Sequence, residues 1–140
     1  MSTYTQAYFH IIFAVRRRVP CIFSNRERIE KYMTGIITNR QHKVLQIYCM
    51  PDHCHIVISQ NINNTIPDLM RELKSDSTNF INKNKLVNGR FSWQEGYAAI
   101  SFSKSKLDIV CRYVKNQEAH HHKKTLEEEY KLFVDEILGN

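Results

Sequence analysis

The order of strand-like and helix-like segments in this chain of 140 residues leaves few possible folds. Short runs rich in aromatic and β-branched residues predict strands, and they alternate with segments whose apolar residues recur at helical spacing. The expected strands cover 4–15, 44–50, 53–59 and 96–102. Only four Gly and three Pro interrupt the chain, so we expect no flexible linker and a single domain over 1–140.

Capping residues mark where the helices begin. The patterns S-x-x-E at 24–27 and T-x-x-E at 125–128 are capping boxes, in which two side chains bind the free backbone N–H groups of the first turn. Thr65 is placed to cap a second helix, and Ser103 or Ser105 a third. The expected element order is therefore β α β β α β α α.

This order resembles the split pattern of ferredoxin-like and RNA-recognition-module folds. It predicts an α+β protein in which an antiparallel sheet carries its helices on one face. The same topology serves nucleic-acid-binding modules and many enzymes, so the fold alone does not identify a function.

An excess of basic residues favours a polyanionic partner. Twenty Lys and Arg face fourteen Asp and Glu, which gives a formal charge of +6 and an isoelectric point of about 9.2. A basic surface without such a partner would have the same composition, so charge leaves both readings open. The candidates for contact with phosphate groups are Arg16, Arg17, Arg18, Lys83, Lys85, Arg90, Lys104, Lys106, Lys123 and Lys124.

The cysteines and the N-terminus indicate a reducing compartment. No C-x-x-C pair occurs, and Cys21, Cys54 and Cys111 lie in apolar surroundings, so a disulfide framework is not expected. The first apolar run is flanked by charge on the wrong side for a signal peptide, and no apolar stretch approaches the length of a membrane span. We therefore expect a cytoplasmic protein with no membrane partner.

Two histidines share one face of the third expected strand. Side chains alternate between the faces of a strand, so His53 and His55 project the same way, about 7 Å apart along it. Cys54 points to the other face, where a small apolar residue packs well. Neutral imidazole is a common ligand for divalent metals, and the pair predicts part of a metal site.

Two other interpretations of the histidine pair stay open. The side chains can be ordinary half-buried histidines of the sheet. A structural zinc site using Cys49, His53 and Cys54 is also conceivable, but it needs convergent ligands, and His53 and Cys54 face opposite ways on a strand.

A tyrosine and a glutamine share one face of the third expected helix. Tyr113 and Gln117 are four residues apart and stack along the helix. A tyrosine hydroxyl can act as a covalent nucleophile when a metal or a base assists it, and a glutamine oxygen suits a hard divalent cation. A packing role in the core is the alternative for Tyr113.

These segments together resemble the small single-tyrosine transposases of bacterial insertion sequences, the insertion-sequence-200-like family. His53-Cys54-His55 is similar to the HUH motif of that family, and 113–117, YVKNQ, is similar to its tyrosine helix. The segment 93–103 resembles the strand before that helix, and 117–122 resembles the segment after it. The similarity runs from residue 8 to about residue 138. The motif has a hydrophobic residue between its two histidines, and here that residue is Cys54, which is only weakly hydrophobic. This difference should not impair metal binding.

The resemblance implies an HUH endonuclease architecture and a set of roles. Tyr113 would be the nucleophile, and His53, His55 and Gln117 would hold a divalent metal, Mg or Mn. Open metal positions would then take phosphate oxygens and water. Attack on a phosphate would produce a 5′-phosphotyrosine and a free 3′-hydroxyl, and a different 3′-hydroxyl could reverse the step without ATP.

The resemblance also implies the partners. These are single-stranded DNA and DNA hairpins at the ends of a mobile element, in the nucleoid of a prokaryotic cytoplasm. One tyrosine per chain implies a homodimer, in which the tyrosine helix of one subunit can complete the partner's site.

Several further aromatic and histidine residues invite a functional interpretation. Phe91, Trp93 and Tyr97 could stack on bases, although core packing is the better expectation for Trp93. His10 could sit beneath the metal site, and a buried core position is expected for it. The histidines at 120–122 lie between two helices, where one could donate to a phosphate.

Three other functions compete with a transposase. A domesticated relative acting on chromosomal repeats would share the chemistry but not the mobile element. A non-catalytic nucleic-acid-binding module would bind DNA without forming a covalent adduct. A metal phosphohydrolase would cleave DNA with water as the nucleophile.

Overall fold

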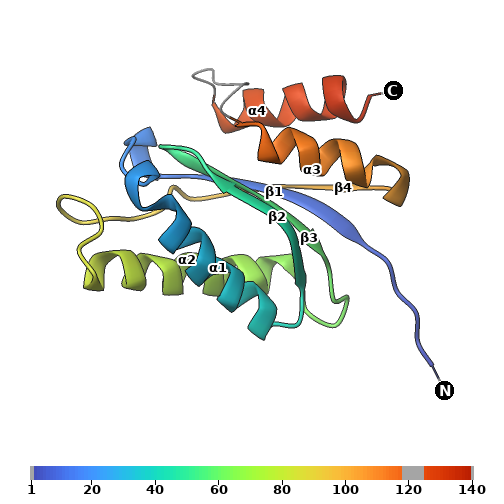
Figure 1. Ribbon diagram of the computed structural model, residues 1–140, viewed down its shortest axis with the longest axis horizontal. Helices are drawn as coiled ribbons and strands as arrows, with labels where there is room; N and C mark the ends of the chain where they lie inside the picture. The colour runs from blue at the N-terminus through green and yellow to red at the C-terminus, as the bar shows by residue number, and fades with distance from the viewer. Residues whose placement is uncertain (1, 118–124, 140) are drawn as a thin grey trace.

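A computed structural model of the chain describes residues 2–117 and 125–139. Four antiparallel strands form one sheet in the order β2-β3-β1-β4 (Figure 1). Their bounds are Tyr8–Ala14 for β1, Lys43–Cys49 for β2, His53–Ser59 for β3 and Ala98–Phe102 for β4. Each strand lies in a segment expected from the sequence or overlaps it closely, and the α+β class is confirmed.

The helices follow the expected order. They are α1 (Arg26–Asn39), α2 (Ile66–Lys83), α3 (Leu107–Lys115) and α4 (Leu126–Leu132), which continues into a π-helical turn, η5 (Phe133–Ile137). Short 3-10 turns cover Arg16–Arg18, Phe23–Asn25 and Lys104–Lys106.

Two of the four expected helix caps form, and two do not. Thr65 accepts a hydrogen bond from the N–H of Asp68, and Thr125 and Glu128 make both bonds of a capping box. At α1 a 3-10 turn precedes the helix, which begins at Arg26, and the capping position makes no side-chain hydrogen bond. The capping box expected at 24–27 is therefore wrong. Ser103 precedes a 3-10 turn and makes no capping hydrogen bond, and the residue before α3 is Lys106, so the cap expected at Ser103 or Ser105 is wrong.

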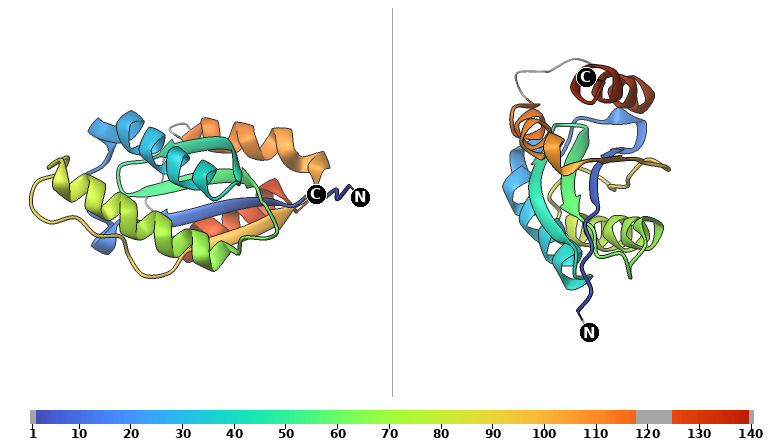
Figure 2. Two further views of the ribbon diagram at one scale, coloured as in Figure 1. Left: turned by 90° about the horizontal axis from the view of Figure 1, so that it is seen from below. Right: turned by 90° about the vertical axis from the view of Figure 1, so that its right-hand side faces the viewer.

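The helices cover both faces of the sheet, not one as the sequence pattern suggested. Figures 1 and 2 show α1 and α2 on one side and α3 and α4 on the other. The correction has a simple cause, because the central strands are apolar on both faces. Ile11 and Phe13 of β1 pack with α1 and α2, whereas Ile12 packs in the second core, below α3 and α4.

The histidines occupy the middle of this two-sided sheet. In β3, His53 lies opposite Ala14 of β1, and His55 lies between Ile12 of β1 and Tyr48 of β2. Val57, on the same face of β3, belongs to the core beneath α3 and α4. The two imidazoles therefore face the pair of helices that includes Tyr113.

Trp93 belongs to the core, as expected. Its side chain is buried, and its Nε1–H donates to the hydroxyl of Ser77 over 2.8 Å. Within 2–117 and 125–139, no helix combines the length and apolar character needed to cross a membrane.

Candidate metal and tyrosine site

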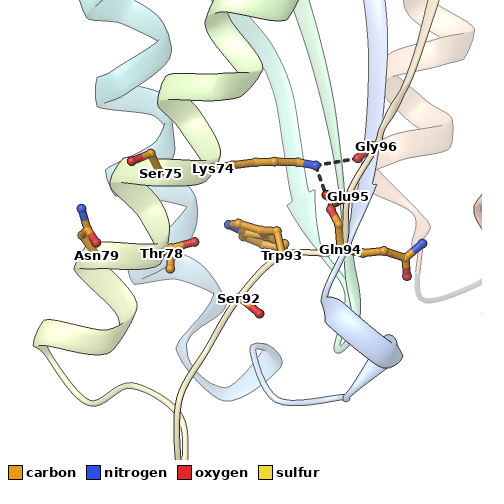
Figure 3. Close-up of a pocket in the computed structure, with 9 residues that line it drawn as sticks. All are labelled: Lys74, Ser75, Thr78, Asn79, Ser92, Trp93, Gln94, Glu95 and Gly96. Atoms are coloured by element: carbon orange, nitrogen blue, oxygen red, sulfur yellow. Dashed lines mark hydrogen bonds between the residues drawn. The ribbon is translucent and has the colours of Figure 1, made fainter.

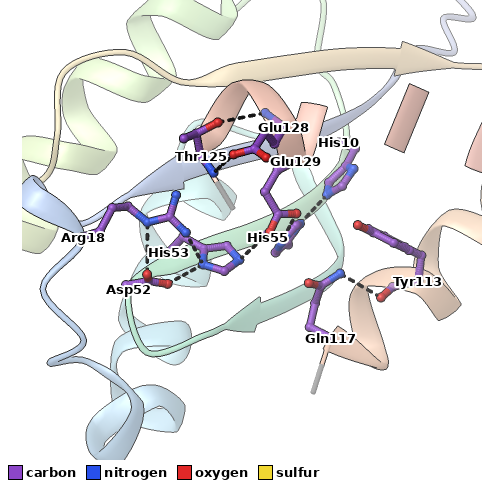
Figure 4. Close-up of polar contacts among 10 residues, drawn as sticks. All are labelled: His10, Arg18, Asp52, His53, His55, Tyr113, Gln117, Thr125, Glu128 and Glu129. Carbon is purple, nitrogen blue, oxygen red and sulfur yellow. Dashed lines mark hydrogen bonds and ion pairs between the residues drawn. The ribbon is translucent and has the colours of Figure 1, made fainter. Parts of the chain in front are cut away.

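His53 and His55 converge with a carboxylate on the α3 and α4 face of the sheet. The Nε2 atom of His53 lies 3.6 Å from one carboxylate oxygen of Glu129, and the Nε2 atom of His55 lies 3.9 Å from the other. All three side chains are buried, and their potential ligand atoms lie within 4.8 Å of one another (Figure 4). Two imidazoles and one carboxylate are a ligand set that can hold a divalent metal.

Glu129 was not among the residues selected from the sequence. It is one of three consecutive glutamates in the first turn of α4, where acidic residues are common because they interact favourably with the helix N-terminus. A signal was nevertheless present. Leu126, Glu129 and Phe133 recur at helical spacing, so this carboxylate interrupts an otherwise apolar stripe that faces the core.

His53 is oriented by a carboxylate at the start of its strand. Its Nδ1 lies 2.7 Å from Asp52, and Arg18 donates from Nε to the second oxygen of Asp52 over 3.1 Å. Burial alone raises the pKa of Asp52, but the hydrogen bonds from His53 and Arg18 and the positive charge of Arg18 outweigh it and lower this pKa to about 2. Asp52 is thus an ionised acceptor, which holds the His53 proton on Nδ1 and turns Nε2 toward Glu129.

The turn that supplies Arg18 has an unusual backbone. Arg17 and Arg18 adopt φ angles of 59° and 55°, a left-handed conformation uncommon for residues other than glycine. This turn follows β1 and brings Arg18 beside Asp52. Arg18, a candidate phosphate contact in the sequence, is therefore engaged within the site.

His10 lies directly beside His55. Its Nε2 is 2.9 Å from Nδ1 of His55, and the side chain is fully buried. Burial lowers the pKa of His10 to about 3, so the ring is neutral. The buried core position expected for His10 is confirmed, and the ring also contacts one of the candidate metal ligands.

Tyr113 faces the histidines from α3. Its ring centroid lies 6.1 Å from that of His55 and 6.0 Å from that of His10. Burial, with the charge of Glu129 adding to it, raises the pKa of Tyr113 to about 12, and a hydrogen bond with Gln117 opposes the rise. The hydroxyl is therefore protonated at neutral pH and needs assistance to act as a nucleophile.

Gln117 lies next to Tyr113 at the end of the same helix. Its side chain is buried, and its Nε2 donates to the backbone carbonyl oxygen of Tyr113 over 3.1 Å (Figure 4). The structure thus brings Tyr113, Gln117 and the histidine pair together on one face, and adds Glu129 and His10 to them.

A small hollow gives access to the tyrosine. It has a volume of about 180 Å³ and is lined by Ile109, Arg112, Tyr113, Asn116 and Ile137. Arg112 is the basic side chain of this hollow, although the sequence did not single it out.

A larger hollow of about 410 Å³ lies between α2 and the segment 92–96 (Figure 3). Lys74 crosses it and donates to the carbonyl oxygens of Gln94 and Gly96. No histidine lines this hollow, and its only acidic residue is Glu95, so it is separate from the metal-ligand group.

The candidate phosphate contacts do not form one patch. The basic residues at 16–18 and at 83–90 lie toward one end of the sheet, and those at 104–106 lie toward the other (Figure 1). Apart from Arg18 and Lys106, which are partly buried, the residues of this set within the described ranges are exposed. Lys123 and Lys124, like the histidines at 120–122, lie outside the described residues.

Comparisons with known proteins agree with this architecture. ISDra2 transposase TnpA of Deinococcus radiodurans is 24% identical over 119 residues, which cover 80% of this chain and 84% of that protein. A crystal structure of a proposed transposase from D. radiodurans R1 superposes with a TM-score of 0.65 at 18% identity, and covers 84% of this chain and 95% of its own. A REP-associated tyrosine transposase bound to a REP hairpin superposes with a TM-score of 0.66 at 14% identity, and covers 86% of this chain and 74% of its own.

The family assignment rests on the sequence match. The model of the family described as "Transposase IS200 like" matches residues 3–117, which include both histidines, the tyrosine and Gln117. The chain shares its fold with one structural neighbour that is a tyrosine transposase. On these grounds the chain belongs to the IS200-like transposase family.

Proposed function

We propose that this transposase cuts and rejoins single-stranded DNA through a covalent bond to Tyr113. The observation that carries the proposal is the position of Tyr113, whose ring lies 6.1 Å from that of His55 and on the same face as Glu129. The Tyr113 oxygen forms a bond to phosphorus while the bond from phosphorus to the 3′ oxygen breaks. The products are a 5′-phosphotyrosine and a 3′-hydroxyl, which takes up a proton.

The residues present fit a divalent metal. Within the described residues, Nε2 of His53 makes no hydrogen bond, although it is buried and faces the Glu129 carboxylate. We propose His53, His55 and Gln117 as ligands, with Glu129 as a fourth, and Mg or Mn as the ion. A metal bound there would polarise the scissile phosphate and offset the charge that develops on it.

The two oxygen ligands can be ranked by charge. Glu129→Gln should weaken Mn²⁺ binding at least about tenfold, because it removes the negative charge of the ligand set. Gln117→Ala should weaken it less, because a neutral amide contributes less to the attraction. Titration calorimetry on both variants measures the ranking. Unchanged binding in Gln117→Ala would remove Gln117 from the ligand set, and unchanged binding in Glu129→Gln would remove Glu129.

A single assay separates the proposed reaction from its competitors. The protein is mixed with a labelled single-stranded hairpin from the end of its own element, with Mg²⁺ or Mn²⁺, and run on a denaturing gel. We expect a covalent protein–DNA adduct that requires the metal. Cleavage without an adduct would make water the nucleophile, and tight binding without cleavage would indicate a binding module.

The proposed DNA substrate is a hairpin flanked by single strands. A structural neighbour of the same fold is bound to a REP hairpin. The basic side chains at 16–17, 83–90 and 104 are exposed at two ends of the sheet, where they can contact phosphates on either side of the site.

We propose further that two chains form a homodimer with composite active sites. In an exchanged dimer, α3 of one chain makes with its partner the contacts that it makes here within one chain. Mixing Tyr113→Phe with His55→Ala, each inactive alone, should then restore adduct formation to about a quarter of the wild-type level or more. If the mixture stays inactive while both variants dimerise, Tyr113 acts on the site of its own chain.

A further inference from the structure

We propose that His10 is a positioning residue that fixes the proton of His55 on Nδ1 and so directs the Nε2 lone pair toward the metal. This inference rests on the proposed metal-dependent function. His10 would not touch the metal or the DNA and would act only through His55.

The sheet places these two imidazoles side by side. His10 pairs with Val57 in the β1–β3 register, and His55 is two residues away on the same face of β3. Such diagonal neighbours are within reach of long side chains. The rings stack with centroids 5.1 Å apart at 24°, and Nε2 of His10 meets Nδ1 of His55 at 2.9 Å.

The two candidate ligands are held in the same way by different partners. Asp52 binds Nδ1 of His53, and His10 binds Nδ1 of His55. In both arrangements the Nε2 atom of the ligand histidine faces Glu129. A metal-binding histidine commonly donates its second N–H to an acceptor, which fixes the tautomer and the ring orientation. A neutral imidazole accepts a hydrogen bond only through its unprotonated nitrogen. Because Nε2 of His10 is the proposed acceptor, the proton of His10 is then on Nδ1.

Core packing alone does not explain a histidine at position 10. Its Nδ1 has no hydrogen-bond partner within the described residues, and the ring otherwise packs against Phe133, with centroids 4.2 Å apart at 71°. An aromatic ring accepts at most a weak N–H contact. A leucine would fill position 10 with no unpaired polar atom of its own. The hydrogen bond to His55 is therefore the one contact of His10, within the described residues, that a leucine could not replace.

Variants of His10 separate positioning from packing. His10→Leu removes the acceptor, and His10→Gln keeps an oxygen near the position of Nε2. We expect His10→Leu to weaken Mn²⁺ binding about 10–100-fold, the usual effect of losing an outer partner of a metal ligand, and His10→Gln to recover most of this loss. His42→Gln serves as the control, because His42 is also buried but binds the N–H of Asn61 away from the site.

Two measurements decide the inference. Urea denaturation should show that His10→Leu folds cooperatively, and unchanged Mn²⁺ affinity in this folded variant would overturn the positioning role. Nitrogen NMR of the metal-free wild type should show protons on Nδ1 of both His55 and His10, with a coupling across the hydrogen bond. A proton on Nε2 of His10 would reverse the bond and overturn the inference. Failure of the wild type to bind Mn²⁺ would overturn the proposed metal site, and the NMR result would still decide the role of His10.

Discussion

Replacing Tyr113 with Phe should abolish the covalent protein–DNA adduct and reduce strand cleavage by about 10⁴-fold or more. The variant removes only the hydroxyl oxygen, which is the proposed nucleophile. The aromatic ring remains to pack against Phe133, whose centroid lies 5.5 Å away. Hairpin binding should therefore persist, because the phosphate contacts lie on other side chains. The measurement is the yield of adduct on a denaturing gel, with hairpin affinity measured in parallel.

A matched control comes from another tyrosine that contacts an aromatic ring. Tyr32 of α1 stacks on Phe80 of α2, on the opposite face of the sheet from the site. Tyr32→Phe also removes one hydroxyl and should leave adduct formation unchanged. Persistence of the adduct in Tyr113→Phe would show that a different residue attacks the phosphate, and the proposed mechanism would then be wrong.

Replacing His55 with Ala should weaken Mn²⁺ binding by more than about 100-fold and abolish metal-dependent cleavage. Removing a residue that hydrogen-bonds to a metal ligand lowers the metal affinity about 10–100-fold, so removing a ligand itself should lower the affinity further. His55 is fully buried and faces Glu129, and its ring centroid lies 6.1 Å from that of Tyr113. Calorimetric titration with Mn²⁺ and the adduct assay measure the two effects separately.

Loss of folding must be separated from loss of the metal. His55→Ala leaves a gap between β3 and α3, so His55→Gln is a second variant that keeps more of the volume. His42→Ala is the control for removing a buried imidazole elsewhere. If His55→Gln folds and binds Mn²⁺ as tightly as the wild type, His55 is not a ligand, and the histidine pair is part of the core only.

Features that depend on local periodicity could be predicted from the amino-acid sequence. The alternation of side chains along a strand placed His53 and His55 on one face, and the helical repeat placed Gln117 beside Tyr113. Local hydrogen bonding also predicted the caps at Thr65 and Thr125. The family could be recognised because its motifs lie in short segments, and the family match confirms it.

The distant residues that complete the site could not be predicted from the sequence. The sequence pattern did not show that α3 and α4 cover the face opposite α1 and α2, and this packing brings Glu129 within 4 Å of both imidazoles. The strand order likewise brings His10 to His55, and a left-handed turn brings Arg18 to Asp52. Local propensity specifies each element, but contacts between positions 10, 55 and 129 arise only when both faces of an apolar sheet are buried.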